Sequence, residues 1–125
     1  MASPADRRYA TTHEWHKPEG DLVVIGISRF AVDELTDITF LDVPDPAKTL
    51  AKGDTFGEIE SVKATSELYS GIDGQIVEVN QAVLDNPALI NDDPYEQGWI
   101  IKIRPTDASQ LDGLMSPTDY DAQQG

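Results

Sequence analysis

Lys63 lies at the centre of a nearly symmetrical segment, between the Lys52-Gly-Asp54 turn and the Gly71-Ile-Asp-Gly74 turn. The stretches near 55–60 and 64–69 read as two short strands, and residues 61–64 form the tight connection between them. We therefore expect the lysine at the exposed tip of a hairpin. An amine in that position is accessible to covalent modification and suits a protein that holds a cofactor out for others to use. From spacing alone, an ordinary solvated turn lysine explains the pattern as well.

Other chemistries have weaker support in the sequence. His13-Glu-Trp-His16 lacks the spacing of four that a helical zinc motif requires, and we expect no metal site. The segment 26–30 begins like a nucleophile elbow but lacks its final glycine, and no Walker loop or dinucleotide fingerprint is present. The absence of cysteine excludes disulfides, thiolate metal sites and a cysteine nucleophile.

The composition restricts the classes of partner. A chain of 125 residues is expected to form one domain, and its 23 acidic against 9 basic residues give a net charge of -14. This charge argues against nucleic acid and anionic membrane surfaces and favours basic surfaces on protein partners, although solubility alone also explains it. No apolar run approaches a membrane span and residues 1–8 lack an apolar signal core. We expect a cytoplasmic, bacterial protein, or a mitochondrial matrix protein if the chain is a processed organelle form.

The elements around the lysine hairpin are mostly strands. Residues 22–28 alternate β-branched side chains and predict a strand, after which Ser28 caps a short helix over 29–35. Further strands are predicted over 38–43, ended by Pro44 and Pro46, over 75–79, and over 99–103, closed by Pro105. We expect Trp15 and Trp99 to pack in the core.

The remaining segments are turns and short helices. Residues 80–98 are rich in turn signals, with Asn86-Pro87 and Asp93-Pro94 as breaks. Thr106 or Asp107 is expected to cap a helix with apolar residues at 111, 114 and 115, and Ser116-Pro117 to start a last helix whose tail, 121–125, frays. Many short strands with a few short helices predict a mainly β fold, a small barrel or sandwich.

Five segments of the chain carry a resemblance: Glu60-Ser-Val-Lys-Ala64, Thr12-His-Glu-Trp15, Phe40-Leu-Asp-Val-Pro44, Gly74-Gln-Ile-Val-Glu-Val-Asn80 and Asp93-Pro-Tyr-Glu-Gln-Gly-Trp-Ile-Ile-Lys-Ile103. In these segments the chain resembles a known family, the H proteins of the glycine cleavage system, which carry lipoate. The resemblance covers roughly residues 8 to 122, and it departs from the family pattern near residues 29–30, 36–39 and 72–73 without touching the attachment segment.

The resemblance implies a fold and an attachment site. The fold is a barrel-sandwich hybrid of the lipoyl and biotinyl carrier type, a single lipoyl-carrier domain over 1–125 with short helices that include a C-terminal pair. Lys63 would carry lipoate through an amide, and a lipoate-attaching enzyme would recognise the motif around it. That motif comprises Glu60, Ser61, Val62 and Ala64, although Glu60 and Ser61 can equally serve only to shape the hairpin.

The flanking residues separate lipoate from related cofactors. Biotin carriers place methionine on both sides of their lysine, where this chain has Val62 and Ala64. Lipoyl domains of 2-oxoacid dehydrogenases usually have aspartate directly before the lysine, where this chain has Val62. The pattern therefore favours the glycine system.

The implied function is that of a non-catalytic shuttle. The arm on Lys63 would receive an aminomethyl group from the pyridoxal-phosphate-dependent glycine decarboxylase (P protein). It would present the group to the aminomethyl transferase (T protein), and dihydrolipoamide dehydrogenase (L protein) would then reoxidise the arm. Two alternatives stay open: a lipoate-relay protein of the same fold, and an unmodified interaction module.

The resemblance also implies that the loaded arm folds back onto the protein, away from water. Glu14 and Glu67 are candidates to meet the protonated amine there, because a carboxylate favours the charged form, and Thr12 adds a hydroxyl. The alternative is that both glutamates are ordinary surface charges.

Overall fold

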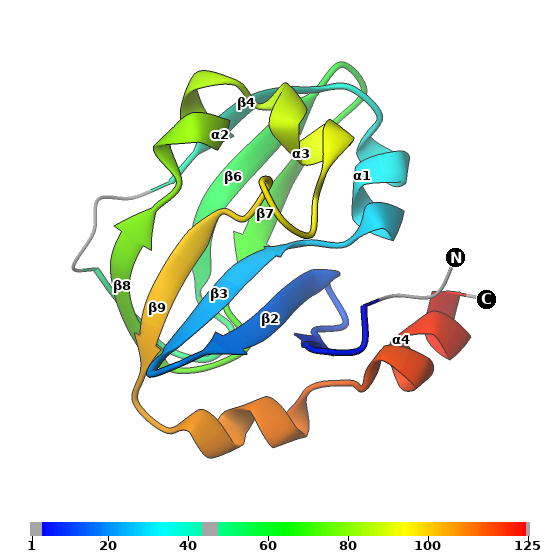
Figure 1. Ribbon diagram of the computed structural model, residues 1–125. Helices are drawn as coiled ribbons and strands as arrows, with labels where there is room; N and C mark the ends of the chain where they lie inside the picture. The colour runs from blue at the N-terminus through cyan, green and yellow to red at the C-terminus, as the bar shows by residue number, and fades with distance from the viewer. Residues whose placement is uncertain (1–3, 44–47, 125) are drawn as a thin grey trace.

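The structure, a computed structural model, describes residues 4–43 and 48–124. In this part of the chain the strands form two antiparallel sheets that share one apolar core (Figure 1). The larger sheet has the order β1 (Arg8–Tyr9), β2 (Glu14–Glu19), β3 (Leu22–Ile27), β9 (Ile101–Pro105), β8 (Gly74–Val79), β5 (Thr49–Leu50), and the smaller sheet has the order β4 (Ile38–Asp42), β6 (Thr55–Ser61), β7 (Thr65–Tyr69). The prediction of a mainly β fold with short helices is confirmed, as two sheets rather than a closed barrel.

Short helices cover the ends and edges of the sheets (Figure 1). They are α1 (Arg29–Leu35), α2 (Gln81–Asp85), α3 (Ala88–Asp92), the 3₁₀ helix η1 (Ala108–Gly113) and α4 (Pro117–Gln124). The predicted bounds of α1 are confirmed, as is its cap, because the Ser28 hydroxyl accepts a hydrogen bond from the Ala31 amide at 3.2 Å. None of the helices in the described ranges is long and apolar enough to span a membrane.

The main core lies between the two sheets. Alternate residues of β3, Val23, Ile25 and Ile27, face Ile59 and Leu68 from the smaller sheet, and all five are almost fully buried. Burying a side chain of this size stabilises the fold by about 1.5–3 kcal/mol. The alternation of β-branched residues that predicts the strand at 22–28 therefore also identifies the face of β3 that packs in the main core.

A second cluster of aromatic side chains lies beside β2. Trp15 is 1% exposed, packs near Tyr9 and Tyr120, and its indole nitrogen donates to the Pro94 carbonyl at 3.0 Å. The prediction that Trp15 packs in the core is confirmed. Trp99 lies partly buried at the edge of this cluster, with the Lys102 amine 5.0 Å from its ring centroid.

The structure also contains elements that the sequence analysis misses. Strand β2 has the sequence Glu-Trp-His-Lys-Pro-Glu, which lacks clean alternation because its first three residues are all buried. Helices α2 and α3 lie in the segment expected to be turns; each is only five residues long and buries one apolar side chain, Val83 or Ile90. The expected helix after Asp107 is the 3₁₀ helix η1, and α4 extends through Gln124 into the segment expected to fray. The strand-ending residues Pro44 and Pro46 lie outside the described residues.

The close contact between β2 and β3 gives a stability prediction. Gly26 pairs with Trp15, and a Cβ atom at Gly26 would lie 2.5 Å from the Trp15 ring. Gly26→Ala must displace this buried ring, and we expect a loss of about 1–3 kcal/mol in the free energy of unfolding, measured by urea denaturation. Gly113→Ala is the matched control, since a Cβ there meets nothing within 4 Å and both changes alter the unfolded chain equally. Equal stability of the two variants would contradict this account.

Candidate functional site

The tip of the β6–β7 hairpin is a tight turn organised by Ser61. The Ser61 hydroxyl accepts hydrogen bonds from the amides of Lys63 at 3.1 Å and Ala64 at 3.0 Å, and the Ser61 amide donates to the Ala64 carbonyl at 2.8 Å. The hairpin predicted from the sequence is therefore present, with Lys63 at its exposed tip. In this structure Ser61 shapes the turn that presents the lysine.

The hairpin tip is attached to the end of α1. The Val62 amide donates to the Asp37 carbonyl at 3.0 Å, and the Lys63 amine donates to the Glu34 carbonyl at 3.1 Å. An ammonium group near a helix C-terminus is electrostatically favourable. The Val62 side chain is 68% exposed beside the lysine. The backbone of the turn is therefore fixed, while the side chains on both sides of Lys63 remain accessible.

A cavity of about 340 Å³ lies next to this tip. It contains three carboxylates, those of Glu14, Glu34 and Glu67, and no lysine or arginine lines it; we call it the acidic cavity. Its walls are the 12–14 segment, α1 and β7, and its lining residues are Thr12, His13, Glu14, Ile27, Phe30, Ala31, Glu34, Leu35, Ile59, Ser66, Glu67 and Leu68. The three residues predicted from the resemblance, Thr12, Glu14 and Glu67, thus all line one cavity.

Glu14 is the buried member of this group, with 1% of its surface exposed. Its carboxylate accepts hydrogen bonds from the Thr12 hydroxyl and, at 3.1 Å, from the Tyr69 amide. Burial raises the pKa of Glu14 from 4.5 to about 7, against the lowering effect of those two hydrogen bonds. The alternative that Glu14 is an ordinary surface charge is therefore wrong.

Glu67 has a different environment. It is exposed at the rim of the acidic cavity, and its carboxylate accepts a hydrogen bond from the Tyr69 hydroxyl at 3.0 Å. This bond raises the pKa of Tyr69. Glu67 thus combines a surface position with a place in the cavity lining.

The acidic cavity lies within reach of an acyl arm on Lys63. Ser66, which lines it, is three residues from the lysine, a separation of roughly 10 Å at about 3.3 Å per strand residue. A lysine extended by a lipoyl group has about twelve bonds from its Cα atom to the ring sulfur and spans roughly 14 Å. Glu34, whose carbonyl binds the Lys63 amine, belongs to the same lining. Apolar side chains such as Phe30 and Leu35 offer contacts to the methylene chain.

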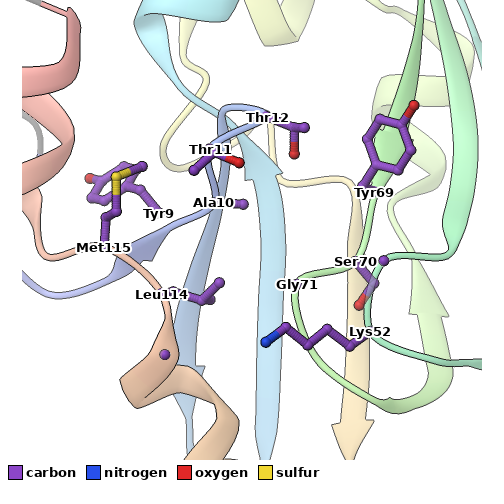
Figure 2. Close-up of a pocket in the computed structure, with 12 residues that line it drawn as sticks. Tyr9, Ala10, Thr11, Thr12, Lys52, Tyr69, Ser70, Gly71, Leu114 and Met115 are labelled. Carbon is purple, nitrogen blue, oxygen red and sulfur yellow. The ribbon is translucent and has the colours of Figure 1, made fainter.

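Figure 2 shows residues that line a second cavity. This cavity has a volume of about 310 Å³ and shares Thr12 with the acidic cavity. Lys52 is its single charged lining residue, and Tyr69, Leu114 and Met115 provide apolar surface. The two cavities are therefore opposite in charge, and only the acidic one is lined by Glu34, whose carbonyl binds the Lys63 amine.

The outer face of the smaller sheet carries a row of like charges. Asp42, Glu58 and Glu67 are paired across β4, β6 and β7, and within the described residues none of them forms an ion pair. Glu60 lies opposite Phe40, which is 52% exposed. This face near the lysine thus presents carboxylates around exposed apolar groups, which suits a partner with basic side chains.

The two histidines do not form a metal site. His13 lines the acidic cavity, whereas His16 is fully buried and its Nε2 accepts a hydrogen bond from the Gly71 amide at 3.0 Å. Burial lowers the pKa of His16 to about 4, so its ring is neutral. Across residues 4–43 and 48–124, no group of three or more potential ligand side chains is arranged to hold a metal ion.

Sequence reasoning missed several residues of the acidic cavity. Phe30 and Ser66 line it, and His13 adopts the left-handed backbone conformation with φ 82°. Tyr120 contacts His13 from the C-terminal helix, and its sequence signal is a single aromatic residue in an otherwise polar segment. An isolated aromatic residue in a polar helix indicates that its side chain is buried. It does not indicate which residue the side chain contacts.

The burial of Glu14 gives a prediction on pH. Because the folded-state pKa is raised, its protonated form stabilises the fold below about pH 4.5, and this contribution is lost as pH rises through about 7. As the pH rises from about 4.5 to about 7, the free energy of unfolding of the wild type should fall by about 3 kcal/mol more than that of Glu14→Gln. The reason is that each pKa unit of difference between the folded and unfolded states is worth about 1.4 kcal/mol. Urea unfolding of both proteins at several pH values measures the difference, in which the other titrating groups cancel. A difference that is constant with pH would contradict the raised pKa.

Three comparisons with known proteins give the same family. The family model described as "Glycine cleavage H-protein" matches residues 7–124. A glycine cleavage system H protein of Synechococcus sp. (strain RCC307) is 47% identical over 98% of this chain and 95% of its own length, and one of Carboxydothermus hydrogenoformans is 45% identical over 94% and 91%. The crystal structure of a glycine cleavage system H protein from Mycobacterium marinum superposes with a TM-score of 0.90 at 39% identity, covering 98% of this chain and 99% of that one. The chain therefore belongs to the glycine cleavage H-protein family.

Proposed function

We propose that this chain is the lipoyl carrier of a glycine cleavage system, with lipoate attached to Lys63 and a cytoplasmic location. The observation that carries the proposal is the exposed Lys63 amine next to the acidic cavity, joined to it through the Glu34 carbonyl. When attached, lipoate would supply a disulfide that takes up the aminomethyl group at the P protein and presents this group to the T protein. The L protein would then reoxidise the dithiol form of the arm. The protein itself supplies position and shelter.

Each part of the site has a role in this proposal. Ser61 fixes the turn, so that an attaching enzyme meets a preformed hairpin with Glu60, Val62 and Ala64 around the lysine. Preorganisation of this kind lowers the entropic cost of binding. The apolar wall of the acidic cavity can take the methylene chain of the arm. Its carboxylates can take the amine of the cargo.

Glu14 is the residue best placed to hold a cationic cargo. Its carboxylate is buried and has two neutral donors but no cationic partner, so it retains capacity for a further charged hydrogen bond. An ammonium group in the acidic cavity would lower the raised pKa of Glu14 and keep the carboxyl ionised. Thr12 positions one carboxylate oxygen, and Glu67 adds negative charge at the rim.

The test of attachment is the intact mass of the chain expressed with lipoate and a lipoate-attaching enzyme. We expect one lipoyl increment, which peptide mapping places on Lys63 and which Lys63→Arg abolishes. Lys52→Arg is the matched control, because Lys52 is also an exposed lysine beside a turn and should leave the modification unchanged. An unmodified wild-type chain, under conditions that lipoylate another carrier, would reject the proposal and favour an interaction module.

The test of shelter is the lifetime of the aminomethyl-loaded carrier, prepared with glycine decarboxylase and followed by release of the carbon into water. We expect Glu14→Gln to shorten this lifetime about tenfold or more, since a lost hydrogen bond to a charged group costs about 1.5–3 kcal/mol. Glu58→Gln is the control, because Glu58 lies on the same sheet with its side chain outside the acidic cavity. Equal lifetimes for the wild type and Glu14→Gln would remove Glu14 from the mechanism.

A further inference from the structure

The hydroxyl group of Tyr120 connects the C-terminal helix to two walls of the acidic cavity. It lies 2.8 Å from Nδ1 of His13 and 2.6 Å from the hydroxyl oxygen of Ser28. The Tyr120 ring is 1% exposed and stacks on Tyr9, with centroids 4.7 Å apart. The hydroxyl is therefore held in place by packing as well as by its partners.

Both partners of Tyr120 belong to the construction of the acidic cavity. His13 lines it directly, and its ring lies 4.9 Å from that of Phe30. Ser28 caps α1, the helix that supplies Phe30, Ala31, Glu34 and Leu35 to the lining. One hydroxyl thus contacts a lining side chain and the start of the helix that supplies four other lining residues.

The hydrogen-bond partners define where the protons lie. Either hydroxyl can donate in the contact between Ser28 and Tyr120. We assign the donor to Ser28, because its hydroxyl is fully buried, already accepts from the Ala31 amide and has Tyr120 as the one acceptor for its proton among the described residues. Tyr120 then donates its proton to Nδ1 of His13. An Nδ1 that accepts a hydrogen bond leaves the imidazole neutral, with its proton on Nε2.

We propose that Tyr120 is a positioning residue that holds His13 as the neutral Nε2–H tautomer in the wall of the acidic cavity. The charged groups that face this cavity are Glu14 from β2, Glu34 from α1 and Glu67 from β7. A cationic His13 would compensate these carboxylates and repel an ammonium cargo. A neutral His13 preserves the negative charge that the cargo requires, and in this respect the inference rests on the proposed function.

The pKa of His13 is consistent with this arrangement. Burial lowers the pKa of His13 below its usual value, and the nearby Glu34 acts in the opposite direction. The hydrogen bond from Tyr120 to Nδ1 also favours the neutral ring, because protonation of Nδ1 would remove the acceptor. Loss of the Tyr120 hydroxyl should therefore raise the pKa of His13.

The first experiment uses the full chain without lipoate, as wild type and Tyr120→Phe, and follows the imidazole nitrogens by nitrogen-15 NMR. Phenylalanine keeps the ring that stacks on Tyr9 and removes only the hydroxyl. We expect the wild type to show the neutral Nε2–H tautomer, and the variant to show mixed tautomers with a raised pKa of His13. The second histidine, His16, is an internal reference that should not change.

Tyr95→Phe is the matched control variant. The Tyr95 hydroxyl accepts a hydrogen bond from the Arg29 amide at 2.9 Å, so its loss also affects the start of α1, but Tyr95 makes no hydrogen bond to His13. We expect Tyr95→Phe to leave the signals of His13 unchanged. An equal change in both variants, or no change in Tyr120→Phe, would overturn the assignment of the tautomer to Tyr120.

The second experiment measures the lifetime of the aminomethyl-loaded carrier between about pH 8 and pH 6. We expect Tyr120→Phe to match the wild type at the alkaline end and to lose its cargo several-fold faster at the acidic end, where its His13 becomes charged. Lifetimes equal to wild type at every pH would overturn the role of His13 in shelter. If Lys63 takes no lipoate, the proposed function fails, whereas the NMR result still decides the tautomer of His13.

Discussion

The buried carboxylate of Glu14 joins two segments that are 55 residues apart in the chain, and the cavity beside Lys63 depends on this junction. Its oxygens bind the Thr12 hydroxyl in the turn before β2 and the Tyr69 amide at the end of β7. A buried carboxylate without a cationic partner is costly, because desolvation disfavours its charged form. The fold tolerates this cost because two packed sheets hold the donors in place. The same desolvation leaves the carboxylate ready to bind a cation.

The charges of the molecule are arranged by location rather than spread evenly. Acidic groups line the cavity next to Lys63, and the cavity beyond Thr12 has Lys52 as its single charged residue. The hairpin tip lies between the acidic cavity and the acidic outer face of the smaller sheet. Under the proposed function, this distribution of the net charge of -14 places negative potential where a cationic cargo and a basic partner would approach.

The sequence predicts local features well and long-range contacts poorly. Helix α1 and its Ser28 cap follow from local chemistry, and the hairpin around Lys63 follows from two alternating strands bounded by glycine turns. Strand β2 escapes prediction because three consecutive buried residues hide its period of two. Thr12, Glu14 and Glu67 are identified as a group by resemblance alone. These three residues line one cavity only because α1, β2 and β7 lie close together in the fold. No local sequence pattern predicts that these elements are neighbours. Tyr120 is missed for the same reason, since its partners lie 92 and 107 residues away.

The row of carboxylates across β4, β6 and β7 has a thermodynamic consequence. Like charges placed directly opposite one another on neighbouring strands destabilise a sheet. Lys48 lines the same surface hollow as Asp42, Glu58 and Glu67, but it forms no ion pair with them among the described residues. A basic surface that docks on this face relieves the repulsion as well as adding attraction. Docking on this face and the stability of the small sheet are therefore linked. Dissolved salt also relieves part of the repulsion, because it screens the carboxylates from one another. This face of the small sheet thus senses the ionic strength of its surroundings.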